Sequence, residues 1–202
     1  MSRHLVMAGR LLDDEPELAW AHALAARARG ARIGAVREAT GLAAYRTGRY
    51  AQALAELRTQ RRLTGSSDHL PIMADCERGL GRPERALALA ASPEAGRLAT
   101  PERVELLIVA AGARSDLGQH DAAVLALHLP ELESTSEEEW VSRLRLAYAN
   151  ALIAVGRTEE AAEWAARAGA SLDEDVRDED DRDEDADADA GLDLVDLLET
   201  DE

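Results

Sequence analysis

The sequence predicts an all-α chain, an α-solenoid of about five helical hairpins followed by a disordered acidic tail. Alanine supplies 41 of the 202 residues, all 23 basic residues are arginine and aromatic residues make up 3%, which favours helices and excludes an all-β fold. A glycine also recurs at intervals of 33, 37 and 38 residues, as in a repeat protein. Finally, acidic residues are concentrated in the last 32 positions, which predicts that this segment does not join the folded domain.

The first three helices are expected over residues 3–13, 17–29 and 32–47. The break before the second helix is the segment Asp14-Glu15-Pro16. The break after it contains Gly30, and this junction resembles the turn inside a hairpin as well as one between hairpins. The pairing of the first two helices therefore stays open.

Four copies of one pattern follow, each with a helix, a glycine, one further residue and a second helix. The glycine adopts a positive φ that ends the first helix, and an alanine five residues later lets the second helix cross closely. We therefore expect ten helices in five hairpins of about 34 residues, with widened loops at residues 92–99 and 129–136. The glycine and alanine pairs are Gly48 and Ala53, Gly81 and Ala86, Gly118 and Ala123, and Gly156 and Ala161.

Two helix starts have capping signals. Thr100 precedes Pro101 and Glu102, which is a capping hydroxyl followed by a proline and an acid in the first turn. Ser136 precedes Glu139 by three residues, which is the spacing of a capping box. The sequence therefore predicts that helices begin at these two hydroxyl residues.

At the repeated residues the chain resembles the tetratricopeptide repeat (TPR) family, whose signature is a small residue on a first helix and then glycine, an aromatic residue and alanine. The resemblance covers residues 33–169 and is good at Gly48-Arg49-Tyr50. The sequence is also similar to an actinobacterial TPR protein, which agrees with its lysine-free, alanine-rich composition but implies no activity. In the later copies the aromatic residue is replaced by Pro83, His120 and Thr158.

The resemblance implies a non-catalytic scaffold that binds a peptide or protein on the concave face of its stacked hairpins. The first helix of each hairpin then lines the inner wall. Some relatives hold a C-terminal carboxylate with lysines and asparagines, but this chain has no lysine and one asparagine, so that specialisation is not expected. The inner-wall residues that the resemblance implies are Glu38, Leu42, Tyr45, Arg46, Asp75, Arg78, Glu105, Ile108, Asp116, Arg143 and Asn150.

Charge divides the chain into a helical domain, residues 1–170, and a tail, residues 171–202. The tail has a formal balance of −15, and the domain a balance of −2. Repulsion between its acids and its lack of residues to bury predict a disordered tail. Its end carries leucines that would share one helical face, which is either a docking peptide or a remnant without a role. Those leucines are Leu194, Leu197 and Leu198.

A second charge feature is a cluster of nine arginines against Glu38 and Glu56 between residues 27 and 62, a local balance of +7. One interpretation is a basic face that docks an acidic partner or nucleic acid; the other is ordinary solvated surface. Nucleic acid is disfavoured as a partner, because Tyr45 and Tyr50 are the only aromatic residues there for stacking. An alternative function follows, in which the acidic tail shields this face in a regulatory accessory subunit. The arginines are Arg27, Arg29, Arg32, Arg37, Arg46, Arg49, Arg58, Arg61 and Arg62.

No motif predicts an enzyme, a metal site or a cofactor. Residues 64–69 contain Ser, Asp and His, but they are adjacent and are explained as a loop with a helix cap. No glycine-rich phosphate loop occurs, and an enzyme could only have a site assembled from scattered residues. The histidines lack the spacing of metal ligands: His4, His22, His69, His120 and His128.

The expected location is the cytoplasm. No 18-residue apolar stretch is present, and Arg10 interrupts the first apolar run, so neither a membrane span nor a secretory signal is predicted. The single cysteine, Cys76, is expected to be a small buried helix residue, as in a reducing compartment. Neither the partner's identity nor the oligomeric state can be predicted from these features.

Overall fold

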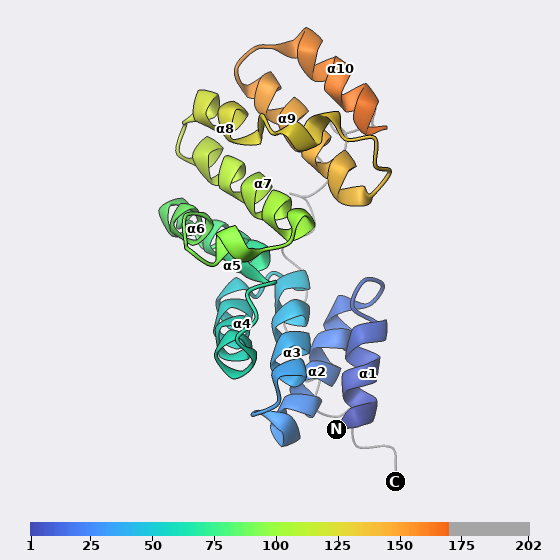
Figure 1. Ribbon diagram of the computed structural model, residues 1–202. Helices are drawn as coiled ribbons and strands as arrows, with labels where there is room; N and C mark the ends of the chain where they lie inside the picture. The colour runs from blue at the N-terminus through green and yellow to red at the C-terminus, as the bar shows by residue number, and fades with distance from the viewer. Residues whose placement is uncertain (170–202) are drawn as a thin grey trace, which may run out of the picture.

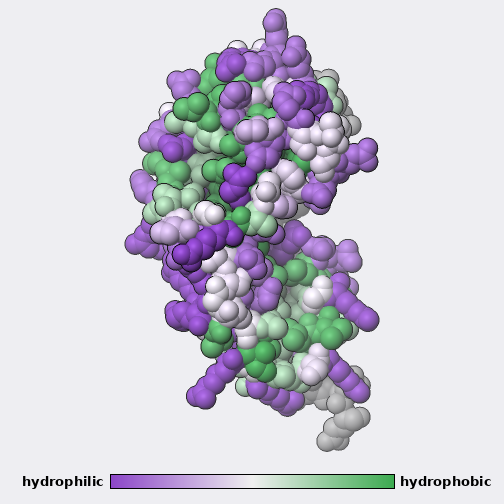
Figure 2. All heavy atoms as spheres, in the orientation of Figure 1, coloured by the Kyte–Doolittle hydropathy of each residue, from purple (hydrophilic) through white to green (hydrophobic). Residues whose placement is uncertain are grey.

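The computed structural model describes residues 1–169, and this part of the chain contains ten α-helices and no strand (Figure 1). The prediction of an all-α fold with ten helices is confirmed. The predicted acidic tail, residues 171–202, lies outside the described residues. No helix in residues 1–169 is long and apolar enough to span a membrane. On the face that Figure 2 shows, hydrophilic and hydrophobic residues are mixed. The helices are α1 (Ser2–Arg10), α2 (Pro16–Gly30), α3 (Gly34–Arg46), α4 (Tyr50–Thr64), α5 (Leu70–Gly79), α6 (Pro83–Ala90), α7 (Thr100–Asp116), α8 (His120–Leu127), α9 (Glu139–Ala154) and α10 (Thr158–Ala168).

Consecutive helices pair as five hairpins, α1 with α2 through α9 with α10. The second helix of each hairpin also packs against the first helix of the next, and α5, α7 and α9 contact one another in sequence. The hairpins therefore follow one another along the molecule, from α1 and α2 at one end to α9 and α10 at the other (Figure 1). This neighbour-to-neighbour packing is consistent with an α-solenoid.

The junction at Gly30 lies between two hairpins. Gly30 is the last residue of α2, is buried and does not have a positive φ. An added Cβ there would lie 2.7 Å from the sulfur of Met1 and 3.0 Å from a methyl of Val36, so the absence of a side chain allows α2 to approach its neighbours. Since α3 forms the Gly48 hairpin with α4, α2 pairs with α1 in the first hairpin.

The turn inside each of the four repeated hairpins is built by the recurring glycine. Gly48 has a φ of 69°, and its N–H donates to the carbonyl of Tyr45, while Arg49 N–H donates to that of Ala44. These two bonds form a Schellman motif, which satisfies the last carbonyls of α3 and requires a left-handed residue. The prediction of left-handed glycines is confirmed in the other three copies, which repeat both bonds: Gly81, Gly118 and Gly156.

Substitution of Gly48 by alanine is expected to lower the free energy of unfolding by about 1 kcal/mol, because a Cβ is strained in the left-handed region. The space around Gly48 is open, so the effect reports backbone strain alone. Urea denaturation followed by circular dichroism measures it. Gly9→Ala is the matched control, since Gly9 lies in α1 with open space and no positive φ and should keep or raise stability. A rise in stability for Gly48→Ala would contradict the assignment.

The alanine that follows each glycine lies where the two helices cross. Ala53, Ala86, Ala123 and Ala161 are fully buried, as expected for residues that permit close approach. In the first repeated hairpin α3 also carries Gly41, whose added Cβ would lie 2.7 Å from the side chain of Leu57 on α4. The absence of a side chain at Gly41 therefore lets Leu57 pack directly against α3.

The two predicted hydroxyl caps are wrong. α7 does begin at Thr100, but its N-cap is Ala99 and no side chain caps the helix, because Thr100 already lies inside it. α9 begins at Glu139 rather than near Ser136, and the Ser136 hydroxyl instead accepts the N–H of Glu138 at 3.2 Å in a turn before the helix. A serine favours turns as readily as caps, and here the local turn prevails.

The two widened loops are confirmed, and each contains a short 3₁₀ helix, Ala95–Arg97 in the first and Pro130–Glu133 in the second. Cys76 is a fully buried residue of α5, as expected, and packs in a cluster with Leu57 and Met73. Burial, together with neighbouring carboxylates, raises the pKa of its thiol to about 12. The thiol therefore acts as an apolar packing group at neutral pH.

Candidate functional site

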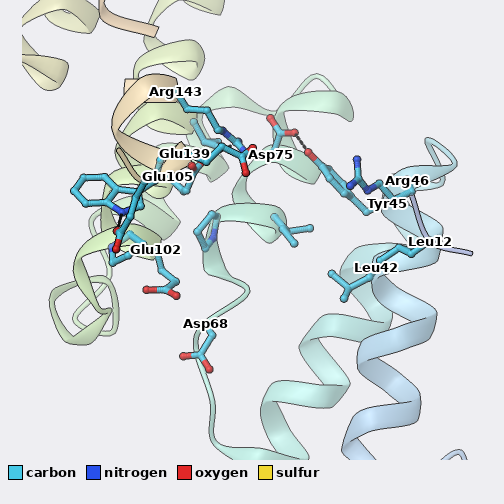
Figure 3. Close-up of a pocket in the computed structure, with 16 residues that line it drawn as sticks. Leu12, Leu42, Tyr45, Arg46, Asp68, Asp75, Glu102, Glu105, Glu139 and Arg143 are labelled. Carbon is cyan, nitrogen blue, oxygen red and sulfur yellow. Dashed lines mark hydrogen bonds and ion pairs between the residues drawn. The ribbon is translucent and has the colours of Figure 1, made fainter. Parts of the chain in front are cut away.

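A groove crosses the first helices of hairpins two to five and has a cavity volume of about 670 Å³ (Figure 3). Its floor is the start of α5; α3 and the α1–α2 loop form one side, and the first turns of α7 and α9 the other. The volume is in the range of protein binding sites. The lining residues are Leu12, Leu42, Tyr45, Arg46, Asp68, Pro71, Ile72, Asp75, Pro101, Glu102, Glu105, Val109, Glu138, Glu139, Trp140 and Arg143.

Helical periodicity explains why these side chains face one space. On α3, Leu42 is followed by lining residues three and four positions later, and on α7, Glu102 is followed by lining residues at three and seven. On α9 the lining pairs are likewise three and four positions apart. Positions with these spacings share one face of a helix. Each first helix therefore presents one stripe of side chains to the groove.

A series of polar contacts joins successive first helices along the groove. The Tyr45 hydroxyl donates to Asp75 at 2.6 Å, which links α3 to α5. Arg78 donates to Asp116 through two nitrogens, at 2.8 and 3.1 Å, and to Asp75 at 3.2 Å, which links α5 to α7. Arg143 continues the series to α9 by donating to Glu105 at 2.7 Å. We call these contacts the ladder.

The Arg78 guanidinium is held flat against α7 at Gly112. A Cβ added there would lie 2.6 Å from the central carbon of the guanidinium, so glycine provides the space that it occupies. The two hydrogen bonds to Asp116 form the fork geometry that arginine makes with a carboxylate, and they raise the pKa of Arg78. This is the strongest contact of the ladder, because its geometry is bidentate.

Substitution of Arg78 by lysine is expected to lower the free energy of unfolding by about 1 kcal/mol, although the charge is kept. A lysine cannot form the fork and cannot contact Asp75 and Asp116 in the same way. Chemical denaturation measures the change, with Arg85→Lys on the exposed surface of α6 as the matched control, expected within about 0.5 kcal/mol of the parent. Equal stability of the two variants would show that the fork contributes nothing.

Two groove residues have ionisation shifted by their surroundings. Burial raises the pKa of Tyr45, and its hydrogen bond to the Asp75 carboxylate raises it further, so its hydroxyl stays a donor. Burial also raises the pKa of Glu105; Glu139 adds to this effect and Arg143 opposes it. Negative charge is therefore costly at Glu105 despite its arginine partner.

The structure brings together part of the predicted inner wall. Arg78 and Asp116 belong to the ladder beside the groove, and Glu38 on α3 instead pairs with the ring of His69 at 2.9 Å. Ile108 packs against the core of the last hairpins, and Asn150 is exposed on α9. The six predicted residues that line the groove are Leu42, Tyr45, Arg46, Asp75, Glu105 and Arg143.

Ten lining residues were not predicted. Most lie at helix starts or in loops, where the repeat pattern carries no signal, as with Leu12 between α1 and α2 and Asp68 before α5. Trp140 had a usable signal, since it is one of three tryptophans in an aromatic-poor chain and stands at the start of a first helix. The others are Pro71, Ile72, Pro101, Glu102, Val109, Glu138 and Glu139.

The nine arginines between residues 27 and 62 are distributed over α2, α3, α4 and the segments between them. Six form ion pairs, and four of the five acids involved come from outside that window, so the local balance of +7 is largely compensated in the fold. Arg29, Arg32 and Arg62 have no carboxylate partner within residues 1–169. The pairs are Arg27 and Arg37 with Glu56, Arg46 with Asp13, Arg49 with Glu17, Arg58 with Glu77, and Arg61 with Glu94.

Within the described part of the chain, no group of three or more His, Cys, Asp or Glu side chains is arranged to hold a metal ion. Residues 64–69 form the end of α4 and the loop to α5, where the Thr64 and Ser66 hydroxyls accept backbone N–H groups. No protein-family model matches the sequence, and no curated protein is significantly similar to it.

Proposed function

We propose that this chain is a non-catalytic scaffold of the cytoplasm, related to the TPR proteins, that binds a peptide or protein in the groove across its first helices. The observation that carries the proposal is the groove itself, to which four successive first helices, α3, α5, α7 and α9, contribute side chains. Repeat proteins use such surfaces to contact an extended partner at several points.

The lining of the groove supports binding rather than chemistry. Tyr45 is committed as a donor to Asp75, and Arg143 to Glu105, so these polar groups hold neighbouring helices together. Apolar side chains such as Leu42, Ile72 and Trp140 lie between the polar ones. This mixture of anchors and hydrogen-bonding groups suits an interface with a peptide.

The test is selection of a displayed random peptide library against the full chain. Selected peptides should lose affinity for Leu42→Ala and Trp140→Ala, because both variants remove apolar anchors from the groove. Leu125→Ala is the control, since Leu125 is 75% exposed on α8 and is not a lining residue. Circular dichroism verifies that each variant is folded. Peptides that bind all variants equally would place the site elsewhere and reject the proposal.

A second function, regulation by the acidic tail, is favoured by a smaller cleft of about 380 Å³ between α4, α5 and α6. Its lining pairs cationic with apolar groups, which complements a segment of alternating acids and leucines such as residues 192–199. The tail would then occupy the cleft until a partner displaced it. The lining residues are Arg58, Arg61, Arg62, Met73 and Leu89.

This second function is tested in the full chain by replacing Leu194, Leu197 and Leu198 with serine. The amide NMR signals of α4 should shift between parent and variant at low salt and coincide at 1 M salt, where the Debye length falls to about 3 Å. The Ser→Ala changes at Ser134 and Ser136, in the loop before α9, should leave the α4 signals in place. Coincident spectra of parent and leucine variant at low salt would reject tail regulation.

A further inference from the structure

The groove carries an excess of negative charge. Six carboxylates line it and only two arginines, Arg46 and Arg143, which gives a formal balance of −4. Both arginines are already paired, Arg143 with Glu105 inside the groove and Arg46 with Asp13 beside it. The lining residue Asp75 is paired with Arg78, which also contacts Asp116.

Four of these carboxylates have no cationic partner among residues 1–169: Asp68, Glu102, Glu138 and Glu139. One oxygen of Glu102 is also buried without a hydrogen-bond partner in this part of the chain. An acceptor that is buried without a donor makes negative charge at Glu102 costly, and a cation bound beside this residue would lower that cost.

The carboxylates of the groove are concentrated on one of its sides. Figure 3 shows Glu102, Glu105 and Glu139 on the side of α7 and α9, while Leu12 and Leu42 lie on the opposite side, beyond α5. Trp140 lies in the first turn of α9, beside the carboxylates, where its indole N–H donates to Glu138. The face of an indole is a favourable contact for a guanidinium or ammonium group.

We propose that the occupant of the groove is a cationic segment of another protein, with arginine or lysine side chains on the α7 and α9 side and an apolar side chain against Leu12 and Leu42. This proposal rests on the proposed function and adds the chemistry of the partner. Charge-assisted hydrogen bonds to Glu102 and Glu139 supply the recognition, and apolar burial supplies the anchor.

Charge complementarity selects this occupant over the chain's own tail. The tail has a formal balance of −15, so its approach to a groove of −4 is repulsive. The raised pKa of Glu105 indicates the same need, because burial and Glu139 destabilise its charge and a nearby cation would stabilise it. A cationic partner therefore relieves the uncompensated charge of the groove, including that of Glu102.

The probes are two short synthetic peptides with identical leucines, one with arginine and the other with glutamate at the remaining positions. Binding to the full chain is followed by two-dimensional NMR of the tryptophan indole N–H groups, which resolves Trp140 from Trp20 and Trp164. The arginine peptide should shift the Trp140 signal, and the glutamate peptide should leave it in place. A Trp140→Phe variant assigns the signal.

Affinity for the arginine peptide should fall about tenfold in Glu102→Gln/Glu139→Gln, because each glutamine keeps an acceptor oxygen but loses the charge that strengthens the hydrogen bond. The matched control is Glu84→Gln/Glu159→Gln, which removes two exposed acids of α6 and α10 away from the groove and should change affinity by less than about twofold. Because every variant has the same acidic tail, binding of the arginine peptide to the tail contributes equally to each measured affinity.

The outcomes separate this inference from the proposed function. If the arginine peptide binds without shifting Trp140, or if both double variants lose affinity equally, it binds the tail or the general acidic surface and the inference is overturned. If library-selected peptides that depend on Leu42 prove neutral or acidic, the inference also fails while the proposed function stands. If no selected peptide depends on Leu42 or Trp140, the proposed function fails.

Discussion

Replacing Leu57 by alanine is expected to lower the free energy of unfolding by about 2–5 kcal/mol, the usual cost of emptying a fully buried leucine site. Leu57 of α4 is completely buried and packs with Ala44, Met73 and Cys76, so it joins hairpins two and three. Its side chain also packs against Gly41 of α3. Because glycine has no side chain, α3 cannot fill the cavity that the substitution leaves. Chemical denaturation measures the loss as a fall in the midpoint at constant m-value.

The control for Leu57→Ala is Leu125→Ala, in which the same atoms are removed from a site that is 75% exposed. Its free energy of unfolding should stay within about 0.5 kcal/mol of the parent. Equal losses in the two variants would contradict the packing of Leu57 between α3, α4 and α5.

The loss should also be local, because within residues 1–169 the main contacts of each hairpin are with its neighbours. Hydrogen exchange of Leu57→Ala should accelerate in α3 to α6 more than in α9 and α10. Uniform acceleration over residues 1–169 would show instead that the array unfolds as one unit. The same experiment therefore tests how far a change at one hairpin is felt along the molecule.

The turn of each hairpin could be predicted because everything that determines it is local. Gly48 needs its positive φ for two backbone bonds made within five residues, and Ala53 follows at a fixed distance on the next helix. All residues that form this turn are close together in the sequence, and no contact from another hairpin is required.

The helix starts were predicted less well. A serine or threonine suits a cap and a turn equally, and the choice depends on how the preceding loop delivers the chain. Ser136 follows the 3₁₀ helix Pro130–Glu133 and forms a turn, which moves the start of α9 to Glu139. The groove residues Glu139 and Trp140 were missed with it, because their place depends on that start.

The remaining part of the groove depends on packing between hairpins. Leu12 belongs to the loop of the first hairpin, yet it lines the groove together with Leu42 of the second. No periodicity within one hairpin predicts this proximity, since it follows from the angle at which α1, α2 and α3 pack. The inner-wall residues that could be predicted, such as Tyr45 and Arg143, lie well inside first helices.

The local net charge of residues 27–62 was a poor guide to the charge that the folded protein exposes there. Arg58 belongs to the window with a balance of +7, but in the fold it donates to Glu77 at 2.6 Å, from a different hairpin. Glu77 stands at the position that Ala44 occupies in the preceding repeat, and its side chain is only 2% exposed. A buried carboxylate requires a counter-charge, so the main role of Arg58 is to pair with Glu77 rather than to interact with solvent.

Replacing Arg58 by methionine is therefore expected to lower the free energy of unfolding by about 3 kcal/mol, the cost of leaving a buried carboxylate without its main partner. Arg82 is 3.6 Å from the other Glu77 oxygen, which itself has no hydrogen bond within residues 1–169, and so compensates only in part. Arg62→Met is the matched control, because Arg62 is an exposed arginine of the same helix that donates only to the Thr59 hydroxyl.

A comparison of Arg58→Met with Glu77→Met identifies the cause of the loss of stability. Glu77→Met removes the buried charge and leaves Arg58, whose side chain is 48% exposed, in contact with water, so stability should change by less than about 1 kcal/mol. Glu77→Met should then rescue Arg58→Met, because the methionines pack together and no buried charge remains. If Arg58→Met costs no more than Arg62→Met, or if the second substitution restores nothing, Arg58 is a solvated surface arginine and Glu77 depends on other groups.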